Sequence, residues 1–433
     1  MDSMETSKLP WQSSTATEKI TPDDVKRSRG LLSALRPLLI SMSLMGLFDF
    51  WKILEYEEGK TGNRRRFFKF YQITIICILF VNFVRFFLAY GSFEFGPKLL
   101  SSILLHAWLL LCLSYAITCF KMVKHPTKLV SFFNLWKKYW DLVKCVQIDC
   151  SVEQSCSLRQ IRKYTSVCTL IGWSVAIGNA GFCSYALITA TAFENMLEPF
   201  PRSHKLFPVV AGIYHVIILY LSCAWAFTSV LIIVLALSLY YEFKQFVQRM
   251  EKITQNKSIS EVQENIEDLR KQHTALCNML DAADDVLKHQ IGLCLVVHIF
   301  ITLILIYNMC WYEVVRTDPG QLVSHIFWLS GSSTILVALM AACCLVNIQA
   351  HEPAKFIYNL SMKEMTAEFA VQINVFLHRL NGSPIGLTAW SLFVIDNQVV
   401  VSVAGMLATY FVVLLQFQQS SSAPNNSGNA TIV

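Results

Sequence analysis

Seven long and mostly apolar stretches limit how this sequence can fold. A helix of about 20 apolar residues crosses the roughly 30 Å hydrocarbon core of a bilayer, where the backbone must satisfy its own hydrogen bonds. Continuous apolar runs such as 230–240 therefore indicate helices, and the alternating pattern of a membrane β-barrel is absent. The sequence predicts an all-α integral membrane protein whose seven transmembrane helices fall at about 70–90, 99–120, 164–193, 206–240, 289–312, 322–347 and 394–417.

The overall composition agrees with a membrane protein and excludes several other classes. Hydrophobic residues make up 54% of the 433-residue chain and charged residues only 15%. A soluble domain carries about 25% charged residues, so this chain has too few to cover a water-exposed surface. The same composition excludes a disordered chain and a nucleic-acid-binding surface, and we expect no nucleic-acid partner.

An eighth apolar stretch, 31–50, lies in the N-terminal segment 1–69 and is weaker than the other seven. Arg36 and Pro37 interrupt it, and its continuous apolar part, 38–48, is short for a membrane-spanning helix. We therefore predict that 31–50 forms an interfacial or re-entrant helix.

The distribution of Lys and Arg predicts the orientation of the chain. Of the 36 basic residues, 31 lie in segments 1–69, 121–163, 241–288 and 348–393, whereas the alternate loops hold 4 and the tail 418–433 holds none. Cytoplasmic loops carry the excess of positive charge, which predicts a cytoplasmic N-terminus and an extracellular C-terminus. A G-protein-coupled receptor has the opposite orientation, and glycosylation sequons that begin at Asn425 and Asn429 fit an outside tail.

The segments on the cytoplasmic side are long and contain helical patterns of their own. We expect 121–163, 241–288 and 348–393 to be helical extensions that form an anchor region below the membrane. Two arrangements remain open for the second of these, which either packs on its own subunit or joins a bundle between subunits. Its apolar positions recur at heptad-like spacings, with one histidine among them: Val262, Ile266, Leu269, His273, Leu276, Leu280 and Ala283.

Motifs of enzyme chemistry are missing from the sequence. The 14 cysteines form no C-x-x-C pair, the 10 histidines are scattered, and no P-loop, G-x-S-x-G or paired-carboxylate motif occurs. We expect no enzyme, no cofactor and no metal site, with most cysteines serving as small apolar core residues. Arg85 lies close to the outer end of the first span, where a long basic side chain reaches the interface, and Asp396 lies near the start of the last.

The last span carries the most specific motif in the chain. Thr409 and Tyr410 are followed by five apolar residues and then by Gln416 and Phe417. This pattern resembles the C-terminal signature of the arthropod gustatory receptor family, which is related to the insect odorant receptors. In sugar receptors of that family Glu usually follows the Thr-Tyr pair, whereas Phe411 does so here, which argues against a sugar ligand.

The resemblance implies a ligand-gated, weakly selective cation channel that acts as a gustatory-type chemoreceptor in the plasma membrane of a sensory neuron. Its implied partners are a small-molecule tastant, permeant cations, membrane lipid and further subunits, in a homotetramer or in a heterotetramer with related receptors. Residues 70–393 would form the six-helix ligand-sensing region, and 394–417 would line the pore. Val413 matches the family's hydrophobic gate position, and Gln416 matches a polar ring at the outer mouth.

Helix geometry makes such a pore plausible without the resemblance. Val413 and Gln416 are three residues apart and share one face of a helix with Thr409 and, less closely, Val412. Four valines around one axis can close a pore by dewetting, and four glutamine amides can contact a permeating ion. The partial negative charge at the outer C-terminal ends of the helices would favour cations.

A ligand site should combine aromatic and apolar walls with a few polar groups. Such residues occur in the outer halves of spans two to six, and we select Trp328 and His215 first, then Asn308 and Tyr185. Two other functions remain open. A secondary transporter would be expected to show internal repeats or broken helices, and a metabotropic-like receptor would signal through a cytoplasmic partner.

Overall fold

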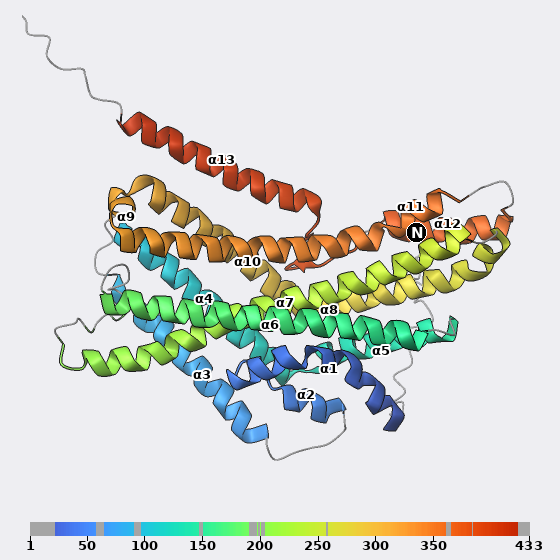
Figure 1. Ribbon diagram of the computed structural model, residues 1–433, viewed down its shortest axis with the longest axis horizontal. Coiled ribbons are helices and arrows are strands. Elements are labelled where there is room, and N and C mark those ends of the chain that lie inside the picture. Colours follow the sequence, from blue (N-terminus) through green and yellow to red (C-terminus); the bar gives the residue numbers. More distant parts are fainter. Residues whose placement is uncertain are drawn as a thin grey trace, which may run out of the picture.

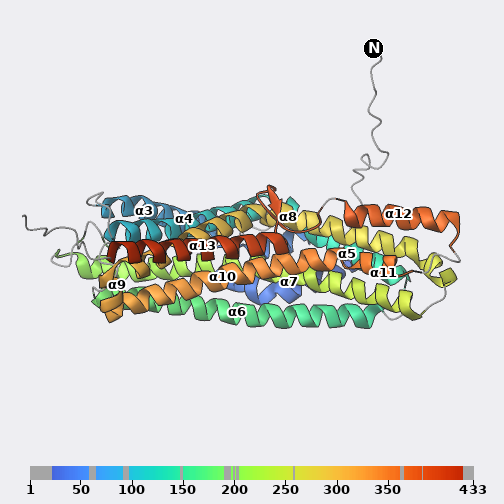
Figure 2. The ribbon, with the colours of Figure 1, turned by 90° about the horizontal axis from the view of Figure 1, so that it is seen from above.

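The computed structural model is an elongated bundle of helices that lie roughly along one long axis (Figures 1 and 2). It describes residues 22–57, 65–90, 97–146, 150–189, 197, 200, 204–256, 259–360, 365–382 and 384–422. Within these residues, seven helices are long and apolar enough to cross a membrane, which confirms the predicted seven-helix fold. They are α3 (Arg65–Arg85), α4 (Pro97–Lys124), α6 (Cys150–Thr189), α7 (Phe207–Asn256), α8 (Ile259–Trp311), α10 (Pro319–His351) and α13 (Asn397–Ser422).

Several helices begin at side chains that cap their free backbone N–H groups. Asp318 precedes α10 and accepts a hydrogen bond from the Gly320 backbone N at 3.0 Å, with Pro319 at the first helical position. Asp396 caps α13 in the same way by accepting from the Val399 N at 2.9 Å. Its carboxylate at the start of the last predicted span therefore has a local structural role.

Two helices extend far beyond the thickness of a membrane. α7 has 50 residues and α8 has 53, which corresponds to about 75–80 Å of helix against roughly 30 Å of hydrocarbon. They pass side by side toward α5 (Thr127–Val146), α11 (Pro353–Tyr358) and α12 (Ala367–Asn381), at the right-hand end of Figure 1. The described residues of the predicted extensions 121–163 and 241–288 are thus helical, apart from a turn at His125 and Pro126.

The heptad-like stripe of α8 packs inside its own subunit. All seven of its residues are buried in the single chain, so this stripe is not a free surface for other subunits. His273, its one polar member, lies among the rings of Phe243, Phe246 and Phe376, and its Nε2 is 3.1 Å from the Ala350 carbonyl oxygen. Of the two arrangements that the sequence left open, the structure shows packing within the subunit.

The stretch 31–50 covers the second half of α1 (Pro22–Leu44) and the start of α2 (Phe50–Glu57). Its apolar part is too short to count among the seven candidate spans. α1 packs against α6, buries Leu35 and Leu38, and receives a hydrogen bond from the Trp173 indole N–H to Ser41 Oγ at 3.0 Å. Its position at a membrane interface stays a prediction.

Short elements complete the described chain: a 3₁₀ turn η1 (Phe86–Ala89), a small helix α9 (Glu313–Thr317), and a hairpin of β1 (Thr388–Ala389) and β2 (Phe393–Val394). The hairpin, which the sequence patterns did not predict, lies between α12 and α13. Trp390 and Ser391 form its turn with φ angles of 53° and 62°, in the left-handed region that L-residues rarely adopt. The hairpin connects the anchor region to the start of α13.

Candidate functional site

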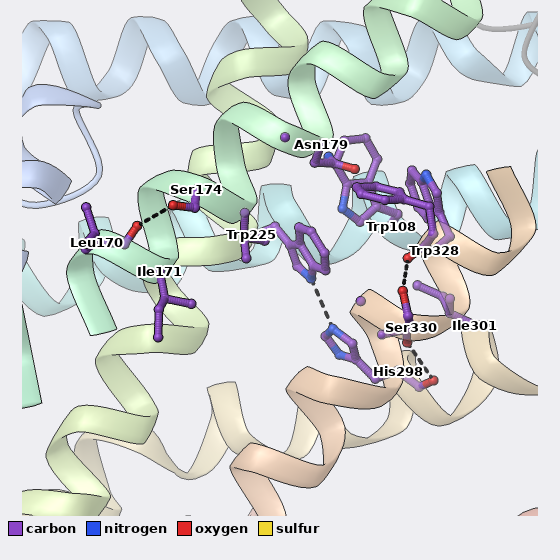
Figure 3. Close-up of a pocket in the computed structure, with 15 residues that line it drawn as sticks. Trp108, Leu170, Ile171, Ser174, Asn179, Trp225, His298, Ile301, Trp328 and Ser330 are labelled. Atoms are coloured by element: carbon purple, nitrogen blue, oxygen red, sulfur yellow. Dashed lines mark hydrogen bonds between the residues drawn. The ribbon is translucent and has the colours of Figure 1, made fainter. Parts of the chain in front are cut away.

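A cavity of about 400 Å³ lies among α4, α6, α7, α8 and α10 (Figure 3). Its volume falls within the range of small-molecule sites, roughly 300–1,000 Å³. Aromatic side chains form much of its wall, with aliphatic residues of α6 and α8 between them. The aromatic residues are Trp108, Trp225, Phe327 and Trp328.

Trp225 and His298 form a fixed polar pair in this wall. The Trp225 indole N–H donates to His298 Nε2 at 3.0 Å, and the rings stack with 16° between their planes. Because Nε2 accepts this bond, the other ring nitrogen, Nδ1, carries the proton and donates to the Cys294 carbonyl oxygen at 2.8 Å. The imidazole is therefore held neutral, and both of its nitrogens have partners; Figure 3 shows the bond from Trp225.

Most other polar groups of the cavity are also bonded to the protein. Asn179 donates through Nδ2 to Ser222 Oγ at 2.8 Å, and Ser332 donates to the His298 carbonyl oxygen at 3.3 Å. The Trp108 indole N–H differs, because it is buried and has no hydrogen-bond partner among the described residues. A cavity of this kind favours an apolar or aromatic molecule that offers one or two hydrogen-bond acceptors.

The structure does not bring the four predicted ligand residues together. Trp328 lies in the cavity wall, with its ring 5.2 Å from that of Trp108. Asn308 is buried outside the lining, 3.5 Å from His325 between Nδ2 and Nε2, and His215 Nδ1 lies 2.5 Å from the Ala211 carbonyl oxygen.

The fourth residue, Tyr185, also lies outside the lining, and its side chain is 62% exposed. The depth of the cavity explains why the sequence did not indicate Trp108, Trp225 and His298. All three occupy the middle of predicted spans, whereas the candidates were chosen from the outer halves. Two tryptophans and a histidine near the middle of three different spans were the available signal.

Arg85, at the end of α3, does not approach the cavity. Its guanidinium donates from Nη2 to Asn82 Oδ1 at 3.0 Å and lies 5.1 Å from the centre of the Tyr214 ring. The cysteines behave mostly as core residues, since Cys112, Cys183 and Cys294, among others, are fully buried and not in disulfides.

A second candidate site is the exposed face of α13. This helix touches its own subunit through α8 and α10, and Leu414 is the one buried side chain between 397 and 416. Figure 1 shows the helix leaning away from the bundle toward its C-terminal end. Its contact with the bundle follows a strip with spacings of three and four residues, made of Val400, Val403, Leu407, Tyr410 and Leu414.

The predicted pore residues lie on the other side of α13. At about 100° of rotation per residue, Val413, Thr409 and Gln416 lie roughly 100–160° around the helix from Leu414. Val412 is 51% exposed and Val413 38% exposed, while Thr409 Oγ1 bonds back to the Gly405 carbonyl oxygen at 2.8 Å. An apolar helix face of this kind, turned away from its own bundle, needs lipid or other protein to cover it.

Comparison with known proteins identifies the class of protein that this bundle represents. The sequence profile of the family described as 7tm Chemosensory receptor matches residues 35–421. No curated protein sequence matches the chain significantly.

Two solved structures share the fold. The insect olfactory receptor OR5 from Machilis hrabei in complex with eugenol has a TM-score of 0.64 at 15% identity, over 90% of this chain and 99% of the receptor. A second structure of the same receptor has a TM-score of 0.67 with the same identity and coverage. The chain belongs to the 7tm chemosensory receptor family, which confirms at family level the resemblance seen in the last span.

Proposed function

We propose that this chain is a subunit of a ligand-gated cation channel that responds to a small, mostly apolar tastant. The ligand occupies the cavity among α4, α6, α7, α8 and α10, beside Trp108 and the Trp225–His298 pair. The structurally similar OR5 was solved with eugenol, a small aromatic molecule, which makes eugenol a suitable first probe. The gustatory character of the proposal rests on the Thr409-Tyr410 and Gln416-Phe417 motif.

The observation that carries the channel proposal is the division of α13 into two faces. One strip contacts the subunit's own bundle, and the opposite face presents Thr409, Val412, Val413 and Gln416 away from it. Four subunits, identical or mixed with related receptors, would place these faces around one axis. The valines then form a gate that closes by dewetting, and the glutamines form a polar ring at the mouth.

The proposed orientation follows from the charge distribution, with the anchor region in the cytoplasm and the α13 C-terminus outside the plasma membrane. In that orientation, the C-terminal ends of four α13 helices place partial negative charge at the outer mouth and attract cations.

Reconstitution of the purified protein alone in a planar bilayer tests this function. The expected result is cation current that rises when an active compound is added, with eugenol as the first of a panel of small aromatic and aliphatic molecules. The channel proposal would be refuted if no compound of the panel evoked current in the bilayer while cells carrying the protein responded through a cytoplasmic transducer. Solute flux without unitary currents would instead identify a transporter.

A further inference from the structure

A second cavity, of about 460 Å³, lies between α6 and α7 and shares no lining residue with the aromatic cavity. Its walls come from Gln160 and Tyr164 on α6 and from 237–248 on α7. These positions fall where the predicted spans 164–193 and 206–240 end on the side assigned to the cytoplasm. The cavity therefore opens at the level where lipid headgroups meet water.

The lining of this cavity is rich in hydrogen-bond donors and carries positive charge. Lys244 is exposed, its ammonium lies 5.8 Å from the centre of the Tyr240 ring, and no carboxylate of the described chain pairs with it. The hydroxyls of Tyr164, Tyr240 and Tyr241 add further donors, and none of the lining residues is acidic. Such a lining fits a phosphate group.

Within the described chain, Gln245 adds an unpaired polar group to the wall of this cavity. Its side chain lines the cavity and is only 7% exposed, yet its Oε1 is buried without a hydrogen-bond partner in the described part of the chain. A buried amide oxygen without a hydrogen bond lowers the stability of the folded state unless a bound group donates to it. A ligand that matches this cavity therefore carries a hydroxyl or ammonium donor next to its phosphate.

From these features we infer that the α6–α7 cavity binds the phosphorylated, hydroxyl-bearing headgroup of an anionic lipid in the cytoplasmic leaflet. The phosphate lies against Lys244 and the tyrosine hydroxyls, and a headgroup hydroxyl donates to Gln245. This site goes beyond the proposed function, and its location on the inner leaflet rests on the proposed orientation. A soluble phosphorylated polyol would offer the same chemistry from the cytoplasm.

Native mass spectrometry of the full-length protein, with dioleoyl-phosphatidylinositol and dioleoyl-phosphatidylcholine added in equal amounts, tests the inference. We expect the wild type to prefer the inositol lipid and Lys244→Gln to reduce its binding about fivefold. Lys244→Arg should keep the preference, as should Lys138→Gln, which removes an exposed lysine of α5 outside this cavity. Gln245→Leu should also weaken binding, because it removes the buried acceptor.

Competition with an excess of glycerophosphoinositol identifies the source of the headgroup. Inositol lipid that stays bound supports the membrane as the source, and displacement of the lipid supports a soluble ligand in the same site. Equal binding of the two lipids by the wild type, or unchanged preference in both Lys244→Gln and Gln245→Leu, would overturn the inference. Because the readout is binding, its failure is distinct from a failure of the channel proposal.

Discussion

Thr388, in the hairpin before α13, is bound to Asp284 of α8 through its backbone N–H and its hydroxyl. Its backbone N donates to Asp284 Oδ1 at 2.6 Å, and its single hydroxyl proton is shared between Oδ1 at 3.0 Å and Oδ2 at 2.8 Å, so these two distances describe one bifurcated bond. One turn further along α8, the Lys288 carbonyl oxygen accepts from the Trp390 backbone N at 3.1 Å. The start of α13 is thereby fixed to the helix that also supplies His298 to the aromatic cavity.

The first prediction concerns transmission between the cavity and the pore. Thr388→Val keeps the shape of the side chain but removes its hydroxyl bond to the carboxylate, which contributes about 1.5–3 kcal/mol. We expect a smaller maximal ligand-evoked current, with little change in the half-maximal ligand concentration, since the cavity is untouched. Whole-cell recording at matched surface expression measures both. Currents of wild-type size would show that the hairpin does not transmit gating.

Gly292 provides the second prediction, because it lies directly under the ring of Trp390. A Cβ at this position would meet three ring atoms at 2.4, 2.7 and 2.7 Å. Gly292→Ala should lower the Tm of the purified protein, since overpacking costs about 1–3 kcal/mol and exceeds the roughly 1 kcal/mol gained in helix propensity.

Gly212→Ala is the matched control for this substitution, since a Cβ at position 212 meets no atom within 4 Å. It should leave the Tm equal or higher. If both variants have the same Tm as the wild type, the hairpin can shift to make room for a methyl group and is not tightly packed on α8.

The third prediction tests the gate. Val413→Ala shortens the apolar side chain on the face of α13 that points away from the bundle, so a ring of four subunits closes less tightly. We expect a severalfold larger basal current at normal surface expression. Val403→Ala, on the strip that contacts the bundle, should not raise the basal current. If basal and evoked currents are both unchanged in Val413→Ala, Val413 is not the gate.

Gln416 gives a fourth prediction, separate from gating. Gln416→Ala removes an amide from the proposed outer ring, so the permeating ion loses contacts but the ligand does not. Unitary conductance or relative cation permeability should change, while the half-maximal ligand concentration stays within about twofold. Identical conductance and permeability ratios would remove Gln416 from the pore.

The fifth prediction fills the aromatic cavity. Gly178 lines it, and a Cβ there would meet no atom within 4 Å, so Gly178→Leu can place its side chain in the cavity without a backbone clash. The half-maximal concentration of an activating ligand should rise at least tenfold, with basal current preserved. Gly181→Leu is the control, because its site is equally open but lies outside the lining. Equal potency of both variants would place the ligand elsewhere.

The seven spans were predictable because a helix buried in lipid must be long and apolar, and a long apolar stretch is recognised directly in the sequence. The same holds for the packed stripe around His273, whose spacing is helical, although periodicity alone could not say which surface covers it. The hairpin has no comparable sequence pattern. Its strands have two residues each, and Trp390 adopts a positive φ without being glycine, because the surface of α8 holds it there.

The candidate sites were predictable to different degrees. Val413 and Gln416 follow from a local motif on one helix, and helix geometry then fixes which face they share. The aromatic cavity joins five helices that are distant in sequence, so its depth and its members depend on packing. Trp328 was found because it lies in the outer half of its span, where the ligand candidates were sought, whereas Trp108, Trp225 and His298 required the fold.

No residue of α13 contributes to the aromatic cavity, which is lined by α4, α6, α7, α8 and α10 alone. Under the proposed function, ligand recognition and subunit assembly would therefore depend on separate parts of the chain. If the proposal holds, substitutions that change which compound the cavity binds would leave the exposed face of α13 intact, and receptors with different ligands could still assemble around one pore.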